Sequence, residues 1–383
     1  MSDHPSHEAP VREAAALPVM LPVKLIGRET ALAQVYGQLK ENRPVLVYGE
    51  PGVGKTALAA TLASAYAQQP GGVLWLTVSD DSLESLIVRV GRAYDVTDIT
   101  NADNPTAMVG AVAATLTQHK PLLVLDGKLD AQVAAKFVTR CADHLPVILL
   151  NREQLDGPWE NVALAPLEAA QAAMMFKQES GLNSPEHDPA IVQLVGLLHH
   201  LPFAIGVAAR AMIATKQTPA SYAGVLNQVK TTTSGSVTEA ALAASFGALN
   251  GALQGVILIM GATFRGEASA ELISLISNAP VESIQQAMNM LAQLRLVERI
   301  ARYGQPYYRL HQITYDFAQA RLSASDRLKD LQDKVRDATL TYAQKYATGS
   351  PETGDKLAAE IENFLAAAKW AMAQGQREVS TKL

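Results

Sequence analysis

The sequence predicts an α/β fold, a parallel sheet covered by helices, in its first 164 residues and a mainly helical fold after them. Short, continuously apolar runs alternate with helical patterns in the first part, as expected of strands that are buried on both faces of a parallel sheet. Beyond about residue 165 the strand-like runs stop, and apolar residues recur at helical spacing. These observations divide the chain into an α/β part and a helical part.

Four apolar runs and a short fifth one predict the strands of the α/β part. They span residues 45–48, 71–78, 121–126, 145–150 and 161–164. Helices are expected around residues 32–39 and at residues 57–63, 83–94 and 105–118. Ligands of such a sheet bind at the carboxyl ends of the strands.

The first strand runs directly into a glycine-rich segment. It reads Gly49-Glu50-Pro51-Gly52-Val53-Gly54-Lys55-Thr56 and fits the pattern G-x-x-x-x-G-K-[ST]. The backbone N–H groups of such a loop and the positive end of the following helix form a cradle for phosphate, and glycines keep Cβ atoms out of it. Lys55 is expected to reach the β- and γ-phosphates, and the Thr56 hydroxyl is expected to bind Mg²⁺. We therefore expect a P-loop NTPase domain.

Two other strand ends carry candidate functional residues. Asp126 ends the third strand, where its carboxylate would either hold the hydration shell of Mg²⁺ or cap a turn. Arg152 follows the fourth strand, where it would either contact the γ-phosphate or lie on the surface. A second carboxylate to orient the attacking water is missing, because Gly127 follows Asp126 and Asp130 is the nearest substitute. Slow hydrolysis is expected.

The helical part ends in a pattern of helices around one hairpin. Helices are expected at residues 171–179, 190–195, 201–214, 239–249, 253–260, 268–276, 281–294, 326–347 and 355–373. A polar linker is expected at residues 231–236. Residues 296–300 and 307–310 predict a hairpin, and three helices followed by a hairpin suggest a winged helix. His311 opens the helix after the hairpin and either packs in a core or donates to a phosphate.

Composition excludes several classes of protein. The chain has 383 residues, a formal net charge of −5 and one cysteine, Cys141, so it forms no internal disulfide and has no global field that would attract nucleic acid or an anionic membrane. The sequence has no signal-peptide pattern and no apolar run long enough to span a bilayer. We expect a soluble, cytoplasmic protein.

These motifs together resemble the NB-ARC module of STAND-class signalling ATPases, over residues 25–374. Residues 25–29, Leu-Ile-Gly-Arg-Glu, resemble the segment of that family that lies against adenine, and Pro202 resembles the proline that packs on adenine. Asp126 and Arg152 lie where the family has its Mg²⁺-binding strand and its first sensor arginine. Arg309-Leu310-His311-Gln312 resembles its Met-His-Asp motif, whose histidine holds the β-phosphate of ADP.

The resemblance implies a set of site residues and a domain plan. Lys55, Asp126 and Arg152 are the expected catalytic residues, and Thr56 and Asp126 are the expected Mg²⁺ ligands. ATP or ADP is expected to contact Leu25, Ile26, Arg28, Gly52, Val53, Gly54, Lys55, Thr56, Ala57, Pro202 and His311. The expected domains are a flexible arm (1–24), a nucleotide-binding domain (25–164), a helical domain (165–232), a winged helix (233–323) and a helical linker (324–383) toward tetratricopeptide-like sensor repeats, with neither those repeats nor an effector domain in the chain.

Three residues depart from the family pattern. His200 replaces a glycine, Gly127 replaces a frequent acidic residue, and Gln312 replaces the aspartate of the Met-His-Asp motif. The last change puts the tightness of the ADP-locked state in doubt.

The expected function is an ATP/ADP switch with weak Mg²⁺-dependent ATPase activity. The closed form would hold ADP, and ATP would open it for self-association, with an upstream ligand and a downstream effector that the sequence does not identify. One alternative is a DNA-binding AAA+ ATPase of the origin-recognition type, which Arg295, Arg299, Arg302 and Arg309, with Arg210 as a second sensor, would support; the net negative charge argues against it. A second alternative, a metabolic P-loop transferase, would need an acceptor pocket.

Overall fold

The computed structural model describes residues 25–79, 82–94, 96, 104–232 and 235–376. Contacts divide them into two compact units. The first contains residues 25–50 and 55–164, and the second contains residues 51–54 and 165–376, apart from the gaps just named. The expected N-terminal arm lies outside the described residues, as do residue 95 and residues 97–103 between the predicted helices at 83–94 and 105–118.

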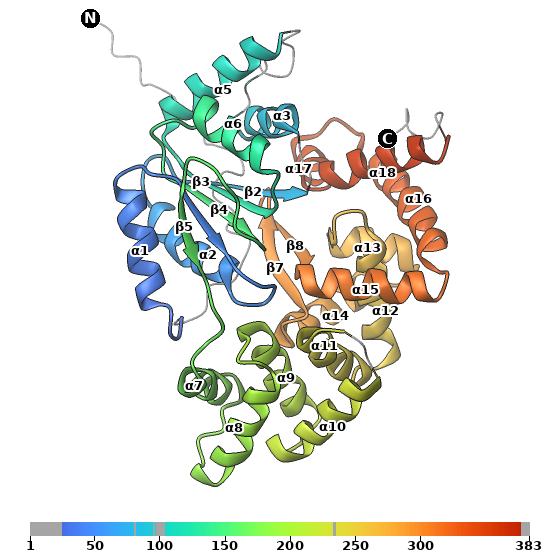
Figure 1. The fold of residues 1–383 in the computed structure, drawn as a ribbon. Helices are drawn as coiled ribbons and strands as arrows, with labels where there is room; N and C mark the ends of the chain where they lie inside the picture. Colours follow the sequence, from blue (N-terminus) through green and yellow to red (C-terminus); the bar gives the residue numbers. More distant parts are fainter. Residues whose placement is uncertain (1–24, 80–81, 95, 97–103, 233–234, 377–383) are drawn as a thin grey trace, which may run out of the picture. The chain divides into compact units, whose positions relative to one another are not determined.

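The first unit is built on a five-stranded parallel sheet (Figure 1). Its strands are β1 (Val45–Tyr48), β2 (Val73–Ser79), β3 (Leu122–Lys128), β4 (Val147–Asn151) and β5 (Glu160–Ala163), in the spatial order β2-β3-β4-β1-β5. All four pairings are parallel. The predicted α/β class is confirmed, because the five strands follow the five apolar runs of the sequence within two residues at each end.

Helices cover both faces of this sheet (Figure 1). One group comprises α1 (Glu29–Lys40) and α2 (Lys55–Tyr66), and the other comprises α3 (Leu83–Ala93), α5 (Pro105–His119) and α6 (Ala131–Cys141). Alternate strand residues such as Leu123 and Leu125 join the second group in one apolar core with Phe137. Burial on both faces explains why the strands are apolar throughout rather than alternating.

The second unit begins with a group of helices. They are α7 (Ala169–Ser180), the 3₁₀ turn η1 (Pro185–His187), α8 (Asp188–Leu197), α9 (Pro202–Ala214), α10 (Pro219–Thr232) and α11 (Val237–Gly247). The sequence analysis did not identify α10, and the predicted linker at residues 231–236 overlaps its last turn. Two neighbouring linker residues, 233 and 234, lie outside the described residues.

Three further helices and a small antiparallel sheet follow. They are α12 (Gly251–Ala262), β6 (Glu267–Ala268), α13 (Ala270–Ser277), α14 (Val281–Gln293), β7 (Val297–Arg302) and β8 (Gln305–Leu310). The predicted hairpin is confirmed as β7 and β8, and β6 adds a third strand in the order β6-β8-β7. The remaining helices are α15 (Gln312–Ala324), α16 (Leu328–Tyr346), α17 (Pro351–Ala359) and α18 (Ile361–Ala373).

The prediction of one helix over residues 355–373 is wrong. The helix breaks at Glu360, whose backbone has φ −101° and ψ 5°, between α17 and α18. The break turns the Glu360 carboxylate into the protein, where it is completely buried. It accepts hydrogen bonds from the Ser269 N–H (2.8 Å), the Tyr307 hydroxyl (2.9 Å) and the Asn363 amide (2.7 Å). The helical spacing of apolar residues does not reveal this break, because the break depends on tertiary contacts with residues far away in the chain.

The buried network ties the two terminal helices to the small sheet. Asn363 also donates to the backbone carbonyl of Glu267 on β6 (2.9 Å), and Arg302 on β7 donates to the Glu267 carboxylate (2.8 Å) and the Ala359 carbonyl (3.3 Å). Burial raises the pKa of Glu360 above its ordinary value, although its hydrogen-bond donors act in the opposite direction.

We predict a pH dependence of folding stability that originates at Glu360. Because its folded-state pKa is raised, the folded chain binds this proton more tightly, and its contribution is complete below the unfolded pKa near 4.5 and is lost as pH rises through the folded pKa. One proton changes the free energy of unfolding by at most about 1.4 kcal/mol per pH unit. Glu360→Gln should remove this pH dependence from the free energy of unfolding, measured by urea unfolding with circular dichroism between pH 4.5 and 8.

The control Glu352→Gln, at an exposed position on α17, corrects for the loss of one carboxylate. An identical slope in Glu360→Gln and wild type would contradict the role of Glu360.

Candidate functional site

The carboxyl ends of β1, β3 and β4 meet at one edge of the parallel sheet. In the strand register, Tyr48 at the end of β1 lies opposite Asn151 at the end of β4, and Leu150 lies opposite Asp126 on β3. Arg152 directly follows β4. The sheet therefore brings the glycine-rich loop, Asp126 and Arg152 to the same edge, as the strand pattern predicted.

Thr56 and Asp126 are in direct contact. The Thr56 hydroxyl lies 3.2 Å from an Asp126 carboxylate oxygen and donates to it. Thr56 stands in the first turn of α2 and Asp126 near the end of β3, so the bond joins two elements that are 70 residues apart in the chain. Two adjacent hard oxygen donors are the protein ligands that Mg²⁺ prefers at phosphate sites.

The described residues contain no cluster of three or more His, Cys, Asp and Glu side chains that could hold a metal ion. A metal ion held at Thr56 and Asp126 would complete its coordination with phosphate and water oxygens, as Mg²⁺ commonly does. The donor set at this edge therefore fits Mg²⁺ and does not fit a metal that needs nitrogen or sulfur ligands.

Lys55 is a partly buried cation held by the loop that precedes it. Its ammonium group donates to the Gly49 carbonyl (2.7 Å) and the Glu50 carbonyl (3.1 Å). The pKa of Lys55 is lowered to about 8, chiefly by burial; nearby Arg152 also acts to lower it, while Asp126 and Glu50 act to raise it. A bound phosphate would stabilise the charged lysine, because it would replace the water that burial has removed.

The position after Asp126 cannot hold a side chain in this backbone. Gly127 has φ +141°, and a Cβ atom added to it would lie 2.0 Å from the Val78 carbonyl oxygen on the neighbouring strand. Asp130, the nearest acidic substitute, is the N-cap of α6 and accepts from the N–H groups of Gln132 and Val133, both at 2.9 Å. Neither position therefore offers the second carboxylate that efficient hydrolysis needs.

The tip of the loop, residues 51–54, groups with the second unit. The Phe203 N–H, in the first turn of α9, donates to the Gly52 carbonyl at 3.0 Å. Gly52 has φ +86°, and a Cβ atom there would lie 3.1–3.3 Å from side-chain atoms of Phe203, Thr238 and Ile313. Glycine is thus required at this position by conformation and by close packing.

His311 stacks on Phe203, with ring centroids 4.2 Å apart and 25° between the planes. Its Nδ1 accepts from the Ile313 N–H (3.3 Å) and caps α15. A neutral imidazole that accepts at Nδ1 carries its proton on Nε2, which makes Nε2 a donor. The sequence analysis missed Phe203; its only signal was its position directly after Pro202.

The other residues predicted to contact nucleotide are buried or partly buried. Leu25 and Ile26 are half-buried, Arg28 is buried before α1, and burial lowers the pKa of Arg28. Val53 is fully buried and Ala57 is partly buried.

Pro202 begins α9 and its Cγ lies 4.0 Å from the place of a Cβ on Gly54. His200 has φ +57°, a backbone conformation that favours glycine.

The arginines that favour a DNA-binding protein are mostly bound to carboxylates within the second unit. Arg295 and Arg210 both donate to Glu179. Arg302 pairs with Glu267 at 2.8 Å, and Arg309 pairs with Glu298 at 2.6 Å. Arg299 is exposed on β7. The helix before the hairpin, α14, contains no lysine or arginine.

No helix within the described ranges has both the length and the apolar character needed to cross a bilayer.

Residues 24–192 match the family profile described as the AAA ATPase domain. A search of curated proteins returned no match. Among solved structures, the chain resembles a Signal Transduction ATPase with Numerous Domains (STAND) protein with a tetratricopeptide repeat sensor from Pyrococcus horikoshii. That match has a TM-score of 0.62 and 16% identity, and it covers 95% of this chain and 50% of the other, so the chain spans about half the length of this relative.

The ORC2 protein of Aeropyrum pernix matches with a TM-score of 0.37 and 12% identity, over 79% of this chain and 97% of that chain. A Walker-type ATPase of Pyrococcus abyssi matches with a TM-score of 0.39 and 12% identity, over 79% of this chain and 98% of that chain. Their scores are too low to support an argument. The profile match over residues 24–192 and the parallel sheet with its glycine-rich loop together support a P-loop ATPase domain in that part of the chain.

We predict that nucleotide affinity falls as pH rises above about 8. Lys55 loses its proton near that pH in the free protein, whereas bound phosphate favours the charged form, so binding takes up a proton. The Kd for ADP should rise by up to about tenfold per pH unit between pH 8 and 9.5, where the phosphate groups are already ionised. Calorimetry across this range measures the slope.

Lys55→Arg is the matched control, because arginine stays charged throughout and should bind ADP with little pH dependence. A wild-type slope in Lys55→Arg would show that another group is responsible, and unchanged ADP affinity in a folded Lys55→Ala variant would overturn the phosphate-loop assignment.

Proposed function

We propose that this protein is a nucleotide-dependent molecular switch that binds ATP and ADP with Mg²⁺ and hydrolyses ATP slowly. The observation that carries the proposal is the Thr56–Asp126 hydrogen bond at the strand edge that also holds Lys55. Lys55 would bind the β- and γ-phosphates, and Thr56 and Asp126 would hold Mg²⁺, which when bound neutralises phosphate charge. Slow turnover agrees with the glycine required at position 127 and with the capping role of Asp130.

The second unit would sense which nucleotide is bound. His311 accepts at Nδ1 and so carries its proton on Nε2, and it stacks on Phe203, whose N–H donates to the carbonyl of the phosphate-loop residue Gly52. We propose that His311 donates to the β-phosphate of ADP in a closed state, with Pro202, Leu25 and Ile26 against the adenine. Helices α12–α14 with the β6-β8-β7 sheet would act as a winged helix that moves when ATP replaces ADP and exposes a surface for self-association.

A DNA-binding function receives less support. Three of the four arginines around the hairpin are paired with carboxylates, and α14, the helix that would enter a major groove, presents no basic residue. Phosphate contacts from Lys and Arg supply most of the affinity of proteins for DNA. The paired arginines are better explained as structural contacts within the second unit.

Arg152 should distinguish ATP from ADP, because it follows the strand next to Asp126 and its charge already acts on Lys55. We expect Arg152→Ala to weaken ATP binding more than ADP binding, by about 1.5–3 kcal/mol for a lost charge-assisted hydrogen bond. Calorimetric titration with ADP and a non-hydrolysable ATP analogue measures the difference. Arg140→Ala, exposed on α6, is the control, and equal losses for the two nucleotides in Arg152→Ala would remove the sensor role.

His311→Ala should lower ADP affinity with little effect on ATP, since the proposed contact exists only in the closed state. A hydrogen bond to phosphate contributes about 1.5–3 kcal/mol, which is roughly a ten- to hundredfold change in Kd. His311→Asn separates this role from helix capping, because asparagine is a good N-cap but cannot reach as an imidazole does. If His311→Asn binds ADP as wild type does, His311 serves only to cap α15.

A further inference from the structure

One carboxylate in the second unit is shared by two arginines from different elements. Glu179 on α7 is almost buried and 7% exposed. Arg210 on α9 donates to it through Nε (3.1 Å) and Nη2 (3.0 Å), and Arg295, in the turn between α14 and β7, donates through Nε (3.0 Å) and Nη2 (2.5 Å). The pair with Arg295 spans 116 residues and joins the turn to the helices of the first part of the unit.

Arg295 occupies a backbone conformation that favours glycine. It has φ +59° and follows α14 directly after its C-cap, Leu294, with its N–H donating to the Ala292 carbonyl. Glycine is the usual residue at such a helix end, because its lack of a Cβ removes the steric penalty.

The neighbouring helix leaves space for the stem of this side chain. Gly206 lies on α9, and a Cβ atom added to it would lie 3.1 Å from Arg295 Cδ. An alanine at position 206 would therefore require the arginine stem to shift by a few tenths of an ångström, without removing any charge.

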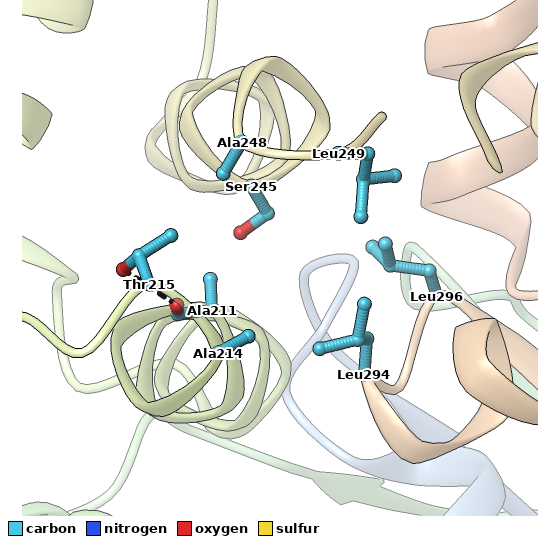
Figure 2. Close-up of a pocket in the computed structure, with 8 residues that line it drawn as sticks. All are labelled: Ala211, Ala214, Thr215, Ser245, Ala248, Leu249, Leu294 and Leu296. Atoms are coloured by element: carbon cyan, nitrogen blue, oxygen red, sulfur yellow. Dashed lines mark hydrogen bonds between the residues drawn. The ribbon is translucent and has the colours of Figure 1, made fainter. Parts of the chain in front are cut away.

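The apolar contact beside Arg295 is incomplete. Leu294 and Leu296, its two neighbours in the chain, face small residues of α9 and α11 across a cavity of about 40 Å³ (Figure 2). The lining includes Ala211, Ala214, Ser245 and Ala248, and Figure 2 shows these side chains directed into the space between the two helices and the turn. Atoms that face a void lose dispersion contacts, so the charged cluster adds to the apolar packing that Leu296 makes where the α14–β7 turn meets α9 and α11.

We propose that Arg295 is a releasable latch that holds the α14–β7 turn against α7 and α9. Release is feasible because Arg210 remains on Glu179 when Arg295 leaves, so no buried charge loses its last partner. The Arg295 side chain is already 42% exposed and would pass into water. The proposal rests on the proposed switch in one respect: the latch would open when the hairpin-bearing helices move in the ATP state.

Hydrogen–deuterium exchange of the nucleotide-free chain tests the latch without relying on nucleotide binding. Arg295→Gly removes the side chain and suits the backbone, and it should raise the exchange rate of peptides from α14 and β7 roughly three- to tenfold, as expected for a partly exposed charge pair. Lys216→Gly is the matched control: Lys216 is an exposed basic residue just past α9 with φ +53°, so it reports the backbone effect alone. Its exchange in α14 and β7 should remain that of wild type.

Gly206→Ala provides a second test that keeps every charge, and because it displaces the arginine stem only slightly it should raise exchange in the same peptides by less than Arg295→Gly does. Wild-type protection of α14 and β7 in Arg295→Gly, or a larger effect in Gly206→Ala than in Arg295→Gly, would overturn the latch. The rate of ADP release, measured separately, tests the proposed switch. Faster exchange of the α14 and β7 peptides with an unchanged rate of ADP release would support the latch and count against its coupling to nucleotide.

Discussion

The partly buried ammonium group of Lys55 is the constraint on which the candidate site depends. Burial removes water from a cation, which lowers its pKa to about 8, and the carbonyls of Gly49 and Glu50 replace only part of that hydration. Asp126 offsets some of the penalty, but it also binds Thr56, and Arg152 opposes the offset. An arrangement of this kind is preorganised for an anion, because a bound phosphate would stabilise both cations, and Thr56 and Asp126 would hold a metal ion that neutralises phosphate charge.

Buried carboxylates organise the second unit in two different ways. The Glu360 carboxylate accepts hydrogen bonds from neutral donors of Ser269, Tyr307 and Asn363. Separating the terminal helices from the small sheet would therefore leave a buried carboxylate without hydrogen-bond partners from that sheet. Glu179 is bound by two partly exposed arginines, one of which can leave while the other stays. The Glu360 network favours the hairpin and the terminal helices moving as one body. The Glu179 network places the proposed releasable contact where the α14–β7 turn packs against α7 and α9.

Local patterns predicted the fold well and the tertiary features poorly. The five strands, the phosphate loop and the hairpin follow from apolar runs and glycine positions that are visible within a few residues. Helices α6 and α10 were not identified, and the break at Glu360 was missed because its cause is a set of donors about 50–90 residues away. The stacking of Phe203 on His311 and the left-handed backbone of Arg295 likewise depend on partners that no sequence period reports.

The three positions at which the sequence differs from the NB-ARC pattern it resembles have different surroundings. His200 has a left-handed backbone, φ +57°, which costs a non-glycine residue roughly 1–2 kcal/mol. Gly127 stands where a neighbouring carbonyl excludes any side chain. Gln312 donates to Asp316 one turn along α15, so its amide is tied to its own helix. The change at Gly127 therefore bears on the proposed slow hydrolysis, whereas Gln312, tied to its own helix, bears on the tightness of the proposed ADP-bound state.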